Sequence, residues 1–185
     1  MTKYRKLPVD EMERLTVEAF HEAPKFPIAL VLDNVRSMHN VGSVLRTADA
    51  FRIDKVYMCG ITPKPPHREI RKTAIGAEES VDWEHHPDAV VLCKELKEQG
   101  YQLLPVEQAE NTMPLEDFIP LEHQPIALVL GHEITGVQQE ILDLADLCLE
   151  IPQFGTKHSL NISVTAGIVL HWMVSQMGIW WREAQ

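Results

Sequence analysis

Two polar side chains, Asn40 and Arg46, stand at the start of a stretch with helical patterning that follows a short apolar run. A helix that begins near Val41 would be capped by Asn40 and would carry Arg46 roughly 9 Å further along its axis. A guanidinium is a forked hydrogen-bond donor that suits anionic groups such as phosphate. Asn40 and Arg46 are therefore candidate functional residues; the alternative is an ordinary cap followed by a surface arginine.

A second candidate segment, residues 130–137, places Glu133 between Gly131 and Gly136. The spacing is not that of the dinucleotide-binding fingerprint, which needs three glycines in a fixed order. Gly131 could let a ligand approach the backbone, and Glu133 could accept hydrogen bonds or lie in the first turn of a helix. Taken alone, this segment is only weakly diagnostic of a site.

The third segment, residues 151–167, runs from a predicted strand through a tight loop into the last predicted helix. Ser159 is the residue expected to cap that helix. Asn161 would then lie inside the first turn of a helix that soon becomes apolar nearly all round. An amide in such a place is unexpected for simple packing, which makes Asn161 a candidate functional residue.

These segments need a scaffold, and the apolar runs of the chain indicate an α/β fold. Short continuous apolar runs fenced by polar turns are typical of parallel strands buried on both faces; they occupy residues 28–32, 56–59, 101–106, 126–130 and 147–151. The hexapeptide PIALVL occurs twice, at 27–32 and 125–130. Helices are predicted at 8–22, 41–51, 87–99, 137–146 and 160–181, with a long loop at 60–82. Ligands of parallel sheets gather at the carboxyl ends of the strands.

Composition narrows the class of protein. Of the 185 residues, 45% are hydrophobic and 24% are charged, as in an ordinary globular chain of one domain. This composition excludes a disordered or collagen-like protein. Cys59, Cys93 and Cys148 have no paired spacing and are expected to be reduced. The longest apolar stretch, 164–174, is too short to span a membrane, and no secretory signal is present, so we expect a cytoplasmic protein.

Charge is divided unevenly along the chain. Residues 1–80 hold 13 basic and 11 acidic side chains, whereas residues 81–185 hold 4 basic and 16 acidic ones. Phosphate contacts need only a local basic patch, so a polyanion would bind in the first half; the candidates there are Arg36, Arg46, Arg52, Lys64, Arg68, Arg71 and Lys72. The alternative is a solvated face of mixed charge.

In this order, the three segments resemble the three motifs of the SpoU (TrmH-type) branch of the SPOUT methyltransferases. The resemblance extends through nearly all of residues 27–175. The residues that match the motifs are Asn40 and Arg46 in the first, Gly131, Glu133 and Gly136 in the second, and Ile151, Pro152, Ser159, Leu160 and Asn161 in the third. Three motifs in the right order are far more specific than any one of them.

The resemblance implies a parallel-sheet, three-layer α/β fold with a C-terminal trefoil knot, and a homodimer. It implies a 2′-O-methyltransferase that uses S-adenosylmethionine on the ribose of RNA, with tRNA the first choice and ribosomal RNA the second. Residues 26–185 would form the methyltransferase domain and residues 1–25 a helical extension. A catalytically silent RNA-binding dimer of the same fold is the alternative from another class.

The resemblance also implies roles for individual residues. The backbone around Leu130, Gly131, Ile151, Ser159 and Leu160 would bind the cofactor, and the catalytic set would be Arg46, Asn40, Glu133, Ser159 and Asn161. Because a guanidinium has a pKa above ~12, we expect Arg46 to hold a phosphate or stabilise an alkoxide, with water or a phosphate oxygen as the base. The histidines show no metal-ligand spacing, so no metal is expected.

The apolar last helix has two interpretations. Its large side chains would either pack in the core or form the seam of the dimer; they are Trp172, Met173, Met177, Trp180 and Trp181.

Overall fold

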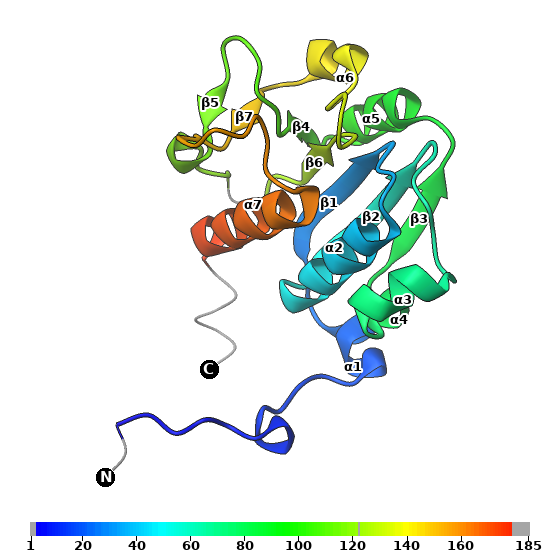
Figure 1. Cartoon of the computed structure of the whole chain (residues 1–185), viewed down its shortest axis with the longest axis vertical. Helices are drawn as coiled ribbons and strands as arrows, with labels where there is room; N and C mark the ends of the chain where they lie inside the picture. The colour runs from blue at the N-terminus through cyan, green and yellow to red at the C-terminus, as the bar shows by residue number, and fades with distance from the viewer. Residues whose placement is uncertain (1–2, 122, 179–185) are drawn as a thin grey trace.

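The computed structural model describes residues 3–121 and 123–178. Its centre is a five-stranded parallel sheet with strand order β3-β2-β1-β6-β4 (Figure 1). The strands are β1 (Phe26–Asp33), β2 (Ile53–Cys59), β3 (Trp83–His86), β4 (Gln102–Pro105) and β6 (Ile126–Leu130). A separate two-stranded sheet pairs β5 (Met113–Pro114) with β7 (Leu149–Glu150). The predicted parallel α/β fold is confirmed.

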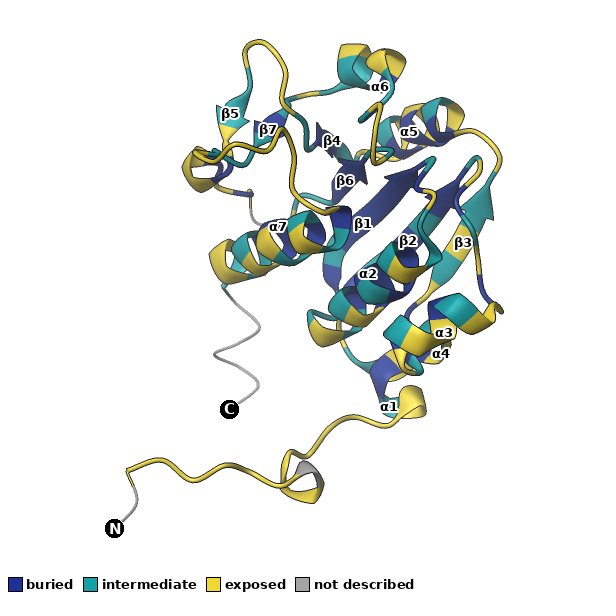
Figure 2. Ribbon diagram, in the orientation of Figure 1, coloured by how far each residue is buried: buried dark blue, intermediate teal, exposed yellow. Residues whose placement is uncertain are grey.

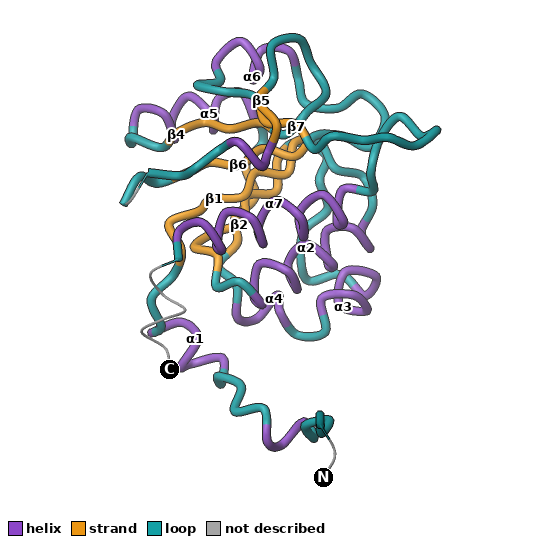
Figure 3. The backbone as a smooth tube through the Cα atoms, turned by 90° about the vertical axis from the view of Figure 1, so that its left-hand side faces the viewer, coloured by secondary structure: helices purple, strands orange, loops and turns teal. Residues whose placement is uncertain are grey.

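Helices cover both faces of the sheet (Figures 1 and 3). One face carries α2 (Met38–Ala50), α3 (Arg68–Ala74), α4 (Ala77–Ser80) and α7 (Ile162–Met177). The other face carries α5 (Ala89–Glu98) and α6 (Gln139–Leu144). Successive residues of β1 divide between the two layers, since Leu30 and Leu32 pack with α2 and α7 whereas Val31 packs with α5 and α6. This burial on both faces explains the continuous apolar runs of the central strands (Figure 2).

The two PIALVL segments contribute to β1 and β6, which are adjacent interior strands of the sheet. β1 and β6 pair in parallel and in register, from Ile28 beside Ile126 to Leu32 beside Leu130. Both strands therefore end at the same edge of the sheet, which brings the first and second candidate segments together there.

Two predicted helix starts are wrong, and both corrections concern candidate site residues. α2 begins three residues early because Ser37 is its cap, with Ser37 Oγ accepting from the N–H of Asn40 at 3.2 Å. Asn40 therefore lies inside the first turn. α7 is capped by Asn161, whose Oδ1 accepts from the N–H of Ser163 at 2.9 Å, and not by Ser159. The caps are chosen by which side chain reaches a free N–H, and several adjacent residues had suitable chemistry.

Other boundaries also differ from expectation. Of the predicted helix 8–22, only α1 (Val17–Glu22) and a 3₁₀ turn (Val9–Glu11) form, and the segment before α1 extends away from the body (Figure 1). The predicted loop 60–82 contains α3 and α4, and β3 follows it. The last strand, β7, pairs outside the main sheet. α7 ends at Met177, where Gly178 takes a left-handed backbone conformation; the rest of the predicted helix, with Trp180 and Trp181, lies outside the described residues.

All three cysteines carry free thiols, as predicted. Burial raises the pKa of Cys59 and of Cys93, the latter to about 12, so neither is a thiolate near neutral pH. No helix in the described part of the chain is long and apolar enough to cross a membrane.

Candidate active site

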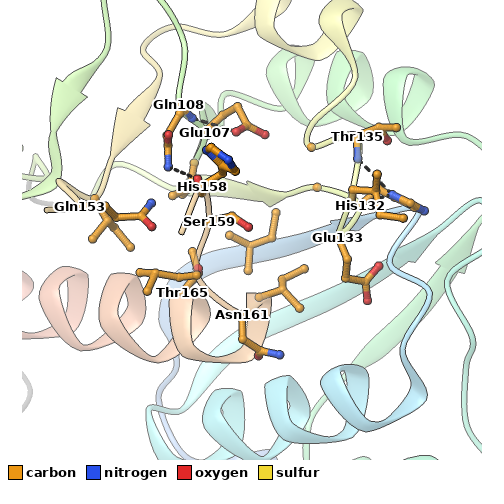
Figure 4. Close-up of a pocket in the computed structure, with 18 residues that line it drawn as sticks. Glu107, Gln108, His132, Glu133, Thr135, Gln153, His158, Ser159, Asn161 and Thr165 are labelled. Carbon is orange, nitrogen blue, oxygen red and sulfur yellow. Dashed lines mark hydrogen bonds between the residues drawn. The ribbon is translucent and has the colours of Figure 1, made fainter. Parts of the chain in front are cut away.

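A pocket of about 480 Å³ lies beyond the carboxyl ends of the strands (Figure 4). Three stretches of backbone line it: residues 106–108 after β4, residues 130–136 after β6, and residues 151–165, which lead from β7 into α7. All five residues predicted to bind the cofactor line this pocket, namely Leu130, Gly131, Ile151, Ser159 and Leu160. The second and third candidate segments thus form one concave site.

The predicted catalytic residues do not all reach this pocket. Glu133, Ser159 and Asn161 line it, whereas Asn40 lies on an adjoining hollow at the start of α2, together with Glu133. Arg46 lies further along α2, exposed in a groove between α2 and α7. Ile151 is the residue that this groove shares with the pocket.

A chain of hydrogen bonds joins the three candidate segments. Glu133 Oε2 accepts from the N–H of Arg36 at 2.9 Å, and Glu133 Oε1 accepts from the N–H of Ser37 at 3.0 Å and from Asn40 Nδ2 at 3.1 Å. Asn40 Oδ1 in turn accepts from Asn161 Nδ2 at 3.2 Å. Because Asn161 also caps α7, this Glu133–Asn40–Asn161 relay fixes the starts of α2 and α7 relative to the 130–136 loop.

The relay holds Glu133 as a carboxylate. Burial alone would raise its pKa, but the hydrogen bonds from the backbone N–H groups of Arg36 and Ser37 and from Asn40 outweigh that effect, so the pKa lies below its usual value. The negative charge also lies at the N-terminal end of α2, where the helix dipole favours it.

A lowered carboxyl pKa makes stability depend on pH. The contribution of Glu133 is present above the ordinary pKa of about 4.3 and is lost as the pH falls through the lower, folded-state value. Glu133→Gln should therefore be less stable than the parent chain at neutral pH, and the difference should shrink in acid. Urea unfolding of both proteins, from neutral pH into acid, measures this difference in the free energy of unfolding. A difference that stays constant with pH would contradict the lowered pKa of Glu133.

Gly131 is required by close packing of the backbone. A Cβ at this position would collide with the backbone of Gly136 and Val137, which folds back over it through paired hydrogen bonds between His132 and Gly136. Gly136 itself has a φ of 70°. The sequence suggested that Gly131 leaves room for a ligand; the structure shows that it leaves room for its own loop.

Gly131→Ala should destabilise the protein by about 1–3 kcal/mol, the usual cost of overpacking. Gly155→Ala is the matched control, because a Cβ there would meet no atom within 4 Å. Thermal unfolding of both variants tests this, and equal stabilities would show that the 131–137 loop adjusts freely.

Among the lining residues, Val106, Glu107 and Gln108 lie outside all three candidate segments, and the side chains of Glu107 and Gln108 are polar. Glu107 Oε2 accepts from the N–H of Val137 at 2.9 Å, and Gln108 Nε2 donates to the carbonyl of His158 at 2.7 Å. They directly follow the predicted strand 101–106, so the rule that ligands gather at the carboxyl ends of strands could have found them.

The groove that contains Arg46 is largely apolar. Its volume is about 850 Å³, and α7 contributes Val164 and Ile168, which are 48% and 38% exposed. Trp172 is half-buried, donating from Nε1 to the carbonyl of Phe118 at 3.0 Å, and Met173 is fully buried. The described part of α7 therefore packs in the core along one side and leaves apolar side chains exposed along another.

The predicted basic patch is partly neutralised. Arg71 forms ion pairs with Glu78 and Glu79, and Lys72 with Glu69. Within the described residues, no ion pair forms at the other candidates, Arg36, Arg46, Arg52, Lys64 and Arg68. In the same part of the chain, no group of three or more His, Cys, Asp or Glu residues could hold a metal ion.

Comparisons with known proteins agree with this geometry. The model of the SpoU rRNA Methylase family matches residues 27–171. The chain is 31% identical over 145 residues to the tRNA (guanosine(18)-2′-O)-methyltransferase of Escherichia coli K12, an alignment that covers 78% of this chain and 61% of that protein. It is 32% identical over 148 residues to the 23S rRNA (guanosine-2′-O-)-methyltransferase RlmB of Neisseria meningitidis, covering 78% and 56%. The chain thus spans about three fifths of the length of these relatives.

A solved structure has the same fold. The TrmH/SpoU tRNA modifying enzyme of A. aeolicus superposes with a TM-score of 0.75 at 27% identity, covering 86% of this chain and 79% of that one. The family match includes β1, β6 and most of α7, and hence all three candidate segments. The chain therefore belongs to the SpoU rRNA methylase family.

Proposed function

We propose that this protein transfers a methyl group from S-adenosylmethionine to a ribose 2′-hydroxyl of RNA. The observation that carries the proposal is the Glu133–Asn40–Asn161 relay, which joins three segments far apart in the sequence at the rim of one pocket. Membership of a methylase family supports the reaction class.

The pocket suits an adenosyl cofactor. Its volume falls in the range of small-molecule sites, and it combines the apolar side chains of Leu130, Ile151 and Leu160 with nearby backbone groups. The carboxylates of Glu107 and Glu133 on its wall favour a ligand with positive charge. When bound, S-adenosylmethionine supplies an electrophilic methyl group on a sulfonium ion. Leu130, Gly131, Ile151, Ser159 and Leu160 are the residues that we assign to hold it.

The protein's own part in the reaction is positioning and charge stabilisation. Holding a ribose oxygen in line with a methyl carbon lowers much of the barrier. Four residues orient the arginine and the ribose-phosphate at the rim of the pocket: Asn40, Glu133, Ser159 and Asn161. Arg46 holds a phosphate or stabilises the alkoxide that develops as the hydroxyl loses its proton. Water or a phosphate oxygen accepts that proton, because a guanidinium offers hydrogen-bond donors and no acceptor.

The active form that we propose is a homodimer. Arg46 lies in the groove between α2 and α7 and does not line its own pocket, and Val164 and Ile168 leave apolar surface exposed beside it. A second copy packed on this groove would cover that surface and could bring Arg46 to a neighbouring pocket. We further propose that residues 26–185 form the methyltransferase domain, with residues 1–25 as an extension and the C-terminal segment knotted.

The RNA that we propose is tRNA, with ribosomal RNA as the alternative, and it would bind over Arg36, Arg46, Arg52, Lys64, Arg68, Arg71 and Lys72. The test is transfer of labelled methyl from S-adenosylmethionine to total RNA from a strain that lacks this protein, with tRNA and rRNA separated afterwards. Label in the tRNA fraction is expected, and label in rRNA would correct the substrate. Bound cofactor without label in either fraction would favour a catalytically silent RNA-binding protein.

A further inference from the structure

Glu107 and Gln108, which follow β4 and belong to none of the three motifs, contact both motif loops of the pocket. Glu107 accepts from the N–H of Val137 in the second segment, and Gln108 donates to the carbonyl of His158 in the third. Figure 4 shows Glu107, Gln108 and His158 together on one side of the pocket. The two side chains therefore tie the loops to the end of β4, an edge strand of the main sheet.

The two loops differ in how firmly they are otherwise held. The 131–137 loop has paired backbone hydrogen bonds between His132 and Gly136, and the Glu107 carboxylate packs against Gly136. Residues 154–160 are all exposed, and within 152–160 the bond from Gln108 is the only hydrogen bond to the rest of the described chain. That bond is the main polar restraint on a loop that contributes four residues to the pocket wall.

We propose that Gln108 is a positioning residue for cofactor binding. Its amide N–H holds the carbonyl of His158 so that the adjacent backbone of Ser159 and Leu160 faces the pocket. Glu107 fixes the opposite loop from the same strand end, so the width of the pocket is set by a pair of neighbouring side chains. This inference rests on the proposed function, since it concerns the affinity for an adenosyl ligand.

Gln108→Glu tests the proposal, because glutamate has the same shape but presents an acceptor to the His158 carbonyl in place of a donor. Gln124→Glu is the matched control. Gln124 Nε2 also donates to a backbone carbonyl at 2.7 Å, that of Gly100, which lies before the start of β4 and so at the opposite end of that strand from Gln108. Gln108→Lys restores a donor at the first position and serves as the rescue variant.

The measurement is the dissociation constant of S-adenosylhomocysteine by calorimetry, with thermal unfolding of each variant alongside. Loss of one net hydrogen bond, about 1 kcal/mol, corresponds to a rise of about fivefold in this dissociation constant. We expect that rise in Gln108→Glu with little change in melting temperature, no rise in Gln124→Glu, and partial recovery in Gln108→Lys. In turnover assays, the KM for S-adenosylmethionine should rise while the KM for RNA does not.

Unchanged affinity in Gln108→Glu would overturn the proposal, as would an equal loss in Gln124→Glu, which would mean general destabilisation. The parent chain is titrated first. If it does not bind S-adenosylhomocysteine, the proposed function itself fails, and that result is distinct from failure of the role of Gln108.

Discussion

Arg46→Ala should reduce methyl transfer to RNA by about 100-fold or more while leaving the affinity for S-adenosylhomocysteine unchanged. Removal of one donor that stabilises developing negative charge has an effect of this size. Cofactor affinity should survive because Arg46 does not line the pocket. The fold should survive as well, since the side chain is exposed in the middle of α2 and alanine favours helix. Single-turnover kinetics and calorimetry measure the two quantities separately.

Two further variants define the role of Arg46. Arg46→Lys keeps the charge but loses the forked donor, so it should recover little of the rate. Arg14→Ala removes an exposed arginine from the segment before α1 and should leave the rate unchanged. A rate in Arg46→Ala close to that of the parent chain would remove Arg46 from the mechanism.

Mixing of two impaired variants tests whether Arg46 acts in the pocket of a second copy. If it does, mixed dimers of Arg46→Ala and Asn161→Ala contain one intact combination of arginine and pocket, and part of the activity should return on mixing. If Arg46 serves the pocket of its own chain, both sites of the mixed dimer remain defective and activity stays low.

Asn161→Ala should weaken cofactor binding and turnover together, each by about tenfold, and lower the free energy of unfolding by about 1 kcal/mol. The stability loss follows from the cap on α7, where Asn161 Oδ1 accepts from the N–H and hydroxyl of Ser163 at 2.9 and 2.6 Å. The functional loss follows from the bond to Asn40, which ties α7 to α2 beside the pocket. Urea unfolding, calorimetry and turnover assays provide the three values.

Asn161→Asp separates these two roles. Aspartate caps a helix as well as asparagine does, so stability should return to near that of the parent chain. Its carboxylate cannot donate to Asn40 Oδ1, so binding and turnover should stay impaired. Full function in Asn161→Asp would mean that Asn161 serves only as a cap.

The sequence was most informative where burial dictates residue type. Continuous apolar runs predicted the central strands, and the rule that ligands gather at the carboxyl ends of strands predicted the pocket around Gly131 and Ser159. Helix starts were less predictable because caps depend on local geometry, and Ser37 and Asn40 both suit a cap. Asn40 was free to reach Glu133 because Ser37 already filled that role.

The parts of the site that were not predicted depend on which residues the fold brings close together. The helical periodicity of the sequence places Arg46 on the same helix as Asn40. It does not reveal that the two side chains line different cavities. Gln108 was not predicted because a glutamine after a strand has no distinctive pattern; its role depends on a carbonyl 50 positions later.

The wide sequence separation of the relay has a consequence for how the protein is made. Glu133 lies 93 residues after Asn40, and Asn161 lies 121 residues after it. The central sheet has the same character, because β6 inserts beside β1 only after β2, β3 and β4 have been synthesised. Contacts of such long range form late and slowly during folding. A chain emerging from the ribosome would therefore have no complete site until α7 docks, and it would gain the capacity to bind ligand only at that step.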